Sequence, residues 1–183
     1  MMKSPIGVAA LFMSMVVAAW TAVAGQQRRA GPPQAHESSA RASVQYKSPD
    51  ESAVALVLPA GKPGHESRES RVEVWSKSGG LLAQHEYSSG DGEHGYGVAK
   101  AAWTPDSGFF VYSLENSGGH QPWHSPVEFY SRAAGRIFSL DDALHDAVAN
   151  AQFSVAAPDR VTVVLWFSKT TRTVSLSALV LRE

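Results

Sequence analysis

Two histidines and a tryptophan form the best candidate in this sequence for a site that binds a metal or a ligand. His120 and His124 stand four residues apart and enclose Gln121, Pro122 and Trp123. On a helix this spacing places two imidazoles on one face, where they could hold a metal ion. The prolines at 122 and 126 disfavour helical backbone at the residues that precede them, and no Glu follows His120 as it does in His-Glu-x-x-His proteases. The stretch is therefore predicted to be a loop.

Three uses of this loop follow from its residue types. It could chelate a metal together with a third ligand such as His85 or His94, which would make the protein a metal-dependent hydrolase. It could contact a glycan or a protein through Trp123, with His120, Gln121 and His124 beside it. It could also be structural, with Trp123 packed and the histidines bonded to the backbone, and this interpretation is favoured.

Other arrangements of reactive residues are weaker. No Gly-x-Ser-x-Gly motif is present, and Asp141 and Asp142 would diverge on a helix, so they are expected to form an acidic first turn. Residues 89–97 are rich in glycine but lack the Lys-Ser/Thr pair of a phosphate loop and the ligand spacing of an EF-hand. We expect a hairpin loop there, at the same end of the sheets as the histidine loop. We assign no catalytic residue, metal or other cofactor.

Five aromatic residues could in principle form a platform for sugar stacking. Core packing is expected to account for most of them, and only Trp123 lies within a polar loop. The five are Trp75, Trp103, Trp123, Tyr130 and Trp166.

Composition narrows the classes of function. The chain has 183 residues, a formal net charge of -1 and no cysteine. A face that binds nucleic acid normally shows a basic excess, so a nucleic-acid partner is not expected. The absence of cysteine excludes disulfides, thiolate metal sites and cysteine nucleophiles. The fold must depend on packing and hydrogen bonds.

The first 24 residues resemble a secretory signal peptide. Lys3 precedes a nearly unbroken apolar run from residue 6 to residue 20, and Ala22-Val23-Ala24 has the small residues of a cleavage site. The run is short for a bilayer span, so cleavage before Gly25 is favoured over a retained membrane anchor. A membrane is expected as a partner only if this segment is not cleaved. We expect a periplasmic or secreted protein. Residues 25–50 are polar and rich in Pro, Ser and Arg, which predicts a disordered linker.

The remaining region, residues 51–183, is predicted to be one all-β domain. Short apolar runs alternate with Gly, Pro, Asp and Ser, which is typical of antiparallel strands and turns. Residues 109–114 have no polar alternation, so this strand should be covered on both faces. One short helix is expected to begin after Ser139, because Leu140, Leu144 and Val148 share a helical face. Predicted strands span residues 52–58, 72–76, 109–114, 127–131, 136–139, 151–155, 161–167 and 173–181.

Part of the domain is repeated. Residues 72–82 match residues 127–137 without a gap, and the Pro105-Asp106 turn matches Pro158-Asp159. A period of about fifty residues in a strand-rich sequence indicates propeller-type blades. The stretch Trp103-Thr104-Pro105-Asp106 with the apolar strand after it resembles the inner strand of WD40-like and TolB-like β-propeller repeats. The chain also resembles small exported bacterial proteins of unassigned function.

This resemblance implies antiparallel sheets from two blade-like repeats, at about residues 72–114 and 127–168, with flanking strands. The length is too small for a closed propeller, which needs about four to eight blades. The sequence therefore predicts an exported, non-catalytic interaction or structural module with an unknown protein or glycan partner. A metal-dependent hydrolase or a glycan-binding module, each using the loop from His120 to His124, is the alternative.

Overall fold

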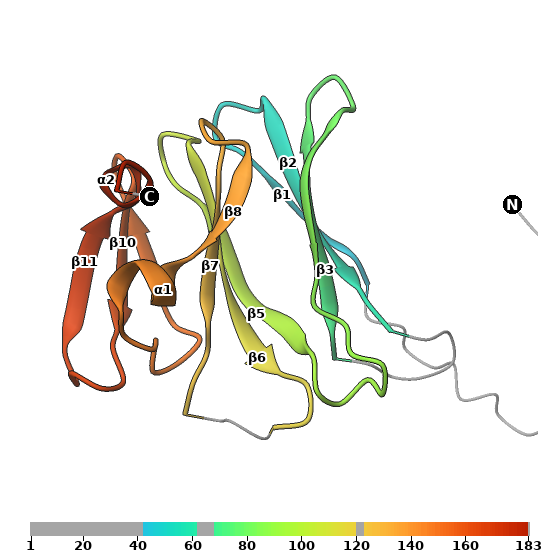
Figure 1. Cartoon of the computed structure of the whole chain (residues 1–183). Coiled ribbons are helices and arrows are strands. Elements are labelled where there is room, and N and C mark those ends of the chain that lie inside the picture. Colours follow the sequence, from blue (N-terminus) through green and yellow to red (C-terminus); the bar gives the residue numbers. More distant parts are fainter. Residues whose placement is uncertain (1–41, 62–67, 120–122, 183) are drawn as a thin grey trace, which may run out of the picture. The chain divides into compact units, whose positions relative to one another are not determined.

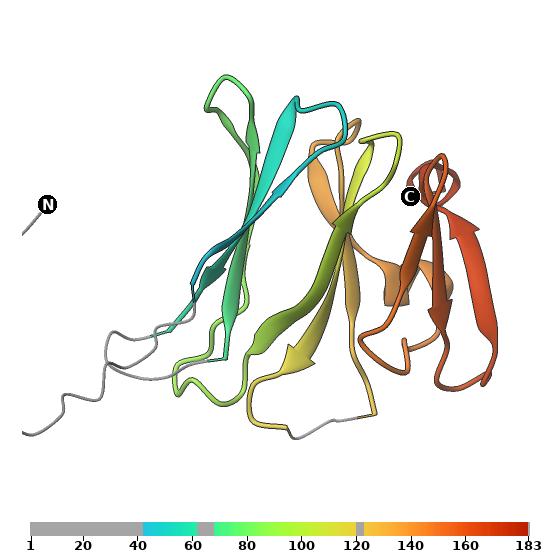
Figure 2. The ribbon, with the colours of Figure 1, turned by 180° about the vertical axis from the view of Figure 1, so that it is seen from behind.

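The computed structural model describes residues 42–61, 68–119 and 123–182. These residues form three antiparallel sheets and two short helices, so the prediction of an all-β fold is confirmed. The sheets follow one another along the chain and lie as layers, with the second sheet between the other two (Figure 1, Figure 2). Among the described residues no helix is long and apolar enough to cross a membrane.

The first and second sheets are four-stranded meanders, in which each strand pairs with the next along the chain. The first sheet contains β1 (Val44–Lys47), β2 (Ala53–Pro59), β3 (Ser70–Ser76) and β4 (Leu81–Glu86). The second sheet contains β5 (Tyr96–Trp103), β6 (Phe109–Asn116), β7 (Val127–Ser131) and β8 (Arg136–Ser139). The 55-residue repeat therefore relates strands at the same positions in two sheets. Strands β3 and β4 of the first sheet correspond to β7 and β8 of the second.

The third sheet is smaller and is followed by a helix. It contains β9 (Ser154–Ala156), β10 (Arg160–Val164) and β11 (Thr171–Ser175), with β10 in the middle. Helix α1 (Leu140–Leu144) leads from the second sheet toward it, and α2 (Leu176–Val180) follows β11. The backbone N–H of Asp142 donates to the Ser139 hydroxyl, so Ser139 caps α1 as its sequence predicts.

The second sheet is buried on both faces. Residues on one face, including Phe110 and Tyr112, pack against the first sheet, and residues on the other, including Phe109 and Val111, pack against the third. Every residue of β6 from Phe109 to Leu114 is buried, as the continuous apolar pattern predicts. Apolar burial on both faces of this sheet stabilises its packing against the first and third sheets.

Pro-Asp turns close the first hairpin of each sheet. In the second sheet the Thr104 hydroxyl donates to the Asp106 carboxylate and accepts from the Phe109 N–H. Ser48 does the same with Asp50 and Ala53 in the first sheet. Each side chain satisfies turn groups that strand pairing leaves unbonded. In the third sheet, Asp159 instead accepts from Ser177 N and the Ser175 hydroxyl at the start of α2.

Several predicted boundaries differ from the structure. Residues 25–50 are expected to form a linker, but β1 lies within that range and pairs with β2, and the turn at residues 48–50 connects the two strands. The strand predicted over residues 173–181 ends at Ser175, where the Ser175 hydroxyl caps α2, so the described chain has two helices and not one. The predicted repeats of residues 72–114 and 127–168 each begin in the third strand of one sheet and end in the next sheet.

Candidate interaction surface

Trp123 and His124, which precede β7, are the two members of the predicted histidine loop that the structure describes. His120 and Gln121 lie outside the described residues. Trp123 is 39% exposed, and its ring stacks on the His124 ring with centroids 5.5 Å apart and planes 22° apart. The loop therefore presents an aromatic side chain that is only partly packed, and a site can be built outward from it.

Trp166 extends this pair into a larger aromatic group. Its centroid lies 5.4 Å from that of Trp123, and the Lys169 ammonium lies 3.3 Å from the Trp166 centroid. A cation over an indole face gains electrostatic energy from the ring quadrupole. His124, Trp123, Trp166 and Lys169 thus form one contiguous group, although Trp123 and Trp166 are 43 residues apart in the sequence. Of the five aromatic residues considered in the sequence, Trp103 and Tyr130 are core residues.

Phe167 follows Trp166 in the sequence and is strongly exposed. Its side chain is 71% exposed at the tip of the β10–β11 hairpin. We call the five residues Trp123, His124, Trp166, Phe167 and Lys169 the aromatic surface. Contiguous exposed apolar patches mark interaction sites, whereas single exposed apolar side chains are ordinary.

Asp146 fixes the hairpin tip that carries Phe167. Its carboxylate accepts hydrogen bonds from Phe167 N at 3.0 Å and Ser168 N at 3.1 Å. Burial tends to raise the pKa of Asp146, but these hydrogen bonds outweigh it and the pKa is lowered. Trp166 N also donates to Ala147 O at 2.7 Å. The tip is therefore held in one conformation before any partner binds, which reduces the entropy lost on binding.

Asp141 anchors the other side of the surface. Its carboxylate accepts from Val148 N at 2.6 Å and Val127 N at 3.3 Å, and its Oδ2 lies 3.6 Å from His124 Nε2. Burial raises the pKa of Asp141, while these backbone bonds and His124 act in the opposite direction. The acid that the sequence assigned to the first turn of a helix therefore lies beside the histidine of the aromatic surface, at a distance longer than a hydrogen bond.

Glu69 joins the glycine-rich loop to the start of the histidine loop. This buried carboxylate accepts from Ser89 N at 2.9 Å, Gly95 N at 2.7 Å and the Ser117 hydroxyl at 3.0 Å. Burial tends to raise the pKa of Glu69, but these bonds outweigh it and the pKa is lowered. The expectation that the two loops meet at one end of the sheets is confirmed, since Ser117 N also donates to Gly95 O. Nothing in the sequence near Glu69 signals this role.

The histidines considered as metal ligands have separate partners. His94 Nδ1 bonds to Asp91, and the His85 ring stacks on Tyr87 with centroids 4.4 Å apart. In the described parts of the chain, no three His, Asp or Glu side chains are grouped so that they could hold a metal ion. The structure therefore brings neither His85 nor His94 into a group of that kind with His124.

A half-buried acid and two phenols form a second polar group between the first and second sheets. The Tyr87 and Tyr112 hydroxyls are 2.7 Å apart, and Glu128 is the cross-strand neighbour of Tyr112. Burial, followed by the charges of Asp141 and Asp142, raises the pKa of Glu128 to about 8. Glu128 is therefore largely protonated at neutral pH. The sequence shows an acid at position 128, but no pattern in it predicts that Glu128 is half-buried.

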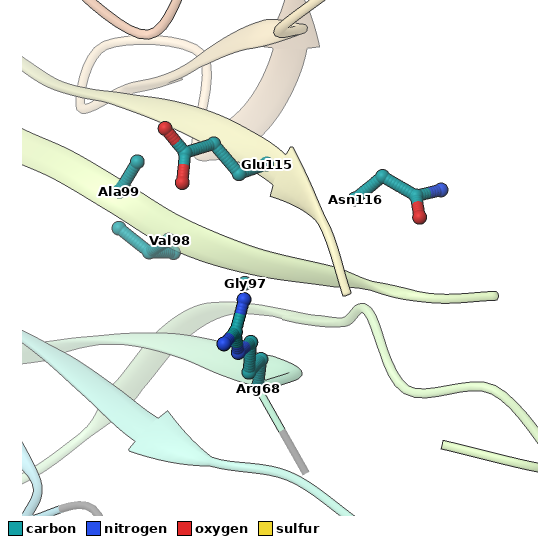
Figure 3. A pocket seen from close by; sticks show the side chains of 6 residues that line it. All are labelled: Arg68, Gly97, Val98, Ala99, Glu115 and Asn116. Atoms are coloured by element: carbon teal, nitrogen blue, oxygen red, sulfur yellow. The ribbon is translucent and has the colours of Figure 1, made fainter. Parts of the chain in front are cut away.

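A polar cavity of about 400 Å³ lies at the ends of β5 and β6. Glu115 and Asn116 extend from β6, and Arg68 lies across the β5 strand from Glu115 (Figure 3). The main chain of Gly97, Val98 and Ala99 forms the wall between them. This volume is within the range of small-ligand sites, but the lining offers little apolar surface of the kind that usually dominates them.

Comparisons with known proteins leave the family open. No family model and no curated protein matches the chain. A search of solved structures finds a chain from a study of two prolyl endopeptidases, with a TM-score of 0.47 and 11% sequence identity. The match covers 74% of this chain and 20% of that one, so this chain spans about a fifth of its length.

Proposed function

We propose that this protein is an exported, non-catalytic interaction module with propeller-type sheets, and that it binds a partner protein through the aromatic surface. The carrying observation is the exposed Phe167 on a hairpin tip fixed by Asp146, next in the sequence to Trp166 of the Trp123–Trp166 pair. Aromatic anchors that are ordered before binding supply most of the affinity in many interfaces. Export is supported by the signal-like first 24 residues.

A glycan is the second candidate partner, because aromatic rings beside His124 and Lys169 also suit sugar stacking and hydrogen bonding. The geometry favours a protein. A sugar needs an open ring face, yet Lys169 covers a face of Trp166 and His124 stacks on Trp123. Within the aromatic surface, Phe167 is the residue with an unstacked and strongly exposed ring. A protein can bind the protruding Phe167 and the ring edges together.

Site-specific photo-crosslinking tests this function. A photoreactive amino acid replaces Phe167 in the full-length chain, which is expressed in the organism that carries the gene. The matched control carries it at Leu181, which is 87% exposed and lies at the opposite end of the third sheet, after α2. We expect a discrete protein adduct at position 167, none at position 181, and loss of the adduct when Trp123→Ala is added.

The outcomes separate the candidates. A protease-resistant adduct that glycosidases remove would support the glycan instead. No adduct at position 167, or equal adducts at both positions, would contradict binding through the aromatic surface. Mass analysis of the exported chain tests export separately, with a mature N-terminus at Gly25 as the expected result.

A further inference from the structure

The polar cavity at the ends of β5 and β6 is not used by the function proposed above. Its volume is about 400 Å³, and Arg68, Glu115 and Asn116 contribute side chains to its lining (Figure 3). None of these residues belongs to the aromatic surface. The volume suits a small molecule. Because covered polar groups need hydrogen-bond partners, the polar lining favours a ligand that is itself polar.

A β-bulge forms one wall of the cavity. Val98 pairs with Leu114 and Lys100 pairs with Ser113, so Ala99 between them has no cross-strand partner of its own. A bulge of this kind bends its strand, and bulges are frequent beside functional sites. The main chain of residues 97–99 lines the cavity at this point, and residue 97 is a glycine with no side chain to fill the space. A ligand can therefore lie directly against the main chain of β5.

Hydrogen bonds hold the walls of the cavity in fixed positions. Glu69, the neighbour of Arg68 in the sequence, accepts from the Ser117 hydroxyl at 3.0 Å. The Ser70 hydroxyl accepts from Val98 N at 3.1 Å. These bonds join the segment that carries Arg68 to β5 and to the end of β6. The site is thus formed before a ligand arrives, which reduces the entropy lost on binding.

The charges of the cavity have opposite signs on its two sides. Glu115 lies across β5 from Arg68 (Figure 3), and no ion pair joins Glu115 to another described residue. A guanidinium presents its N–H donors in a fork that matches a carboxylate, while a carboxylate accepts hydrogen bonds and suits an ammonium group. A simple anion would be repelled by Glu115, and a simple cation by Arg68. A molecule that carries both charges satisfies both side chains.

We propose that this cavity binds a small zwitterion of the amino-acid type, whose carboxylate contacts Arg68 and whose ammonium group contacts Glu115. A free amino acid and a dipeptide share this chemistry and differ in the separation of the two charges. The site goes beyond the proposed function, because it needs neither the aromatic surface nor a protein partner.

Nuclear magnetic resonance on the isotopically labelled full-length chain tests the site with L-alanine as the probe. We expect the amide signals of Gly97 and Ala99 to shift and to saturate at millimolar concentrations or below. Ethylamine lacks the carboxylate and propionate lacks the ammonium group. Each should bind at least about tenfold more weakly than L-alanine, because one charged side chain of the cavity loses its partner.

Two substitutions assign the charges. Arg68→Gln should weaken L-alanine about tenfold and leave ethylamine unaffected, whereas Glu115→Gln should weaken L-alanine about tenfold and leave propionate unaffected. Glu93→Gln and Arg172→Gln are the matched controls, since both side chains are exposed and lie outside the lining of the cavity. They should bind L-alanine as the wild type does. Circular dichroism checks that all four variants are folded.

The remaining outcomes decide the proposal. Tighter binding of L-alanyl-L-alanine than of L-alanine would support the site and identify a peptide as the source of the two charges. No saturable shift with either probe, or equal affinities for L-alanine, ethylamine and propionate, would overturn it. Trp123→Ala should leave the binding of L-alanine unchanged. Loss of binding in that variant would place the ligand on the aromatic surface and overturn the assignment to this cavity.

Discussion

Gly95 is the residue at which the packing of the loop end tolerates least change. A β-carbon at this position would lie 2.3 Å from Tyr87 O and 2.4 Å from Glu69 Oε1. Both neighbours are fixed, since Tyr87 O accepts from Tyr96 N and Glu69 accepts from Gly95 N. The sequence shows a glycine-rich loop, and the Glu69 carboxylate fixes the place of Gly95 within it.

We expect Gly95→Ala to lower the free energy of unfolding by about 2–3 kcal/mol, because the methyl group must displace main chain and a buried carboxylate. Gly90→Ala in the same loop is the matched control. A β-carbon there meets nothing within 4 Å, so its effect should be within about 0.5 kcal/mol. Urea unfolding of the two variants measures the difference. Equal stabilities would show that Glu69 does not hold this loop.

Glu128 gives the protein a pH dependence of opposite sign to that of an ordinary carboxylate. Burial, and then Asp141 and Asp142, raise its pKa from near 4.5 to about 8. Between these two values the folded state keeps a proton that the unfolded chain releases. The unfolded state therefore binds fewer protons, and the stability contributed by this group falls as pH rises from about 4.5 to 8.

Glu128→Gln should remove this dependence. The variant should match the wild type near pH 4.5 and exceed its free energy of unfolding by about 2 kcal/mol or more at pH 8. Urea unfolding at both pH values measures the change, and Glu115→Gln on β6, where the acid is exposed, is the control. A variant that is less stable than the wild type at pH 8 would mean that the Glu128 carboxylate is ionised and bonded in the fold.

At the scale of elements, β1 belongs to the domain although its sequence lies within the predicted linker. The Tyr46 ring packs 5.5 Å from that of Phe110, and Trp103 Nε1 donates to Tyr46 O at 2.9 Å. We expect a chain that begins at residue 51 to lose at least about 3 kcal/mol of unfolding free energy, because it lacks a paired strand and a partly buried aromatic residue. A chain that begins at residue 42 should keep the stability of the mature protein, measured in the same urea titration. Equal stability of the two would show that β1 is dispensable.

The strands that sequence patterns predicted well are those whose side chains pack on both faces. Residues 127–131 and 136–139 match β7 and β8, and residues 109–114 lie within β6. β4 was missed because its side chains are almost all exposed, so it shows no alternation. β5 was missed because Gly97 and several alanines are weak strand formers. Pairing with β6 makes them a strand, and that depends on the tertiary structure.

The candidate surface could be predicted only in part for a related reason. Trp123 stood out because it lies in a polar loop, and the structure leaves it partly exposed. Phe167 was placed at the end of a predicted strand, although it lies on a hairpin tip. The contact between Trp123 and Trp166 depends on how α1 and residues 145–153 return the chain to the third sheet. No pattern in the local sequence specifies that path.

At the scale of the whole molecule, the second sheet couples the other two. One face of the second sheet contributes to each hydrophobic cluster. Loss of the second sheet would therefore expose the apolar faces of the first and third sheets together. Lys100 strengthens the coupling, since its ammonium donates to Phe153 O at 2.6 Å. The described region should therefore unfold as one cooperative unit, as single domains of this size usually do.

Incorporation of 5-fluorotryptophan tests this cooperativity without any substitution. Trp75 reports on the first sheet, Trp103 on the second and Trp166 on the hairpin of the third. We expect the three fluorine signals to move from folded to unfolded positions at the same urea concentration, because each cluster needs the second sheet. Trp123 is the internal control, since its packing on Trp166 requires both loops in place. If the Trp166 signal changed at a lower urea concentration than the Trp103 signal, the third sheet would be an independent unit. The cluster built on Phe109 and Val111 would then add little to the stability of the rest.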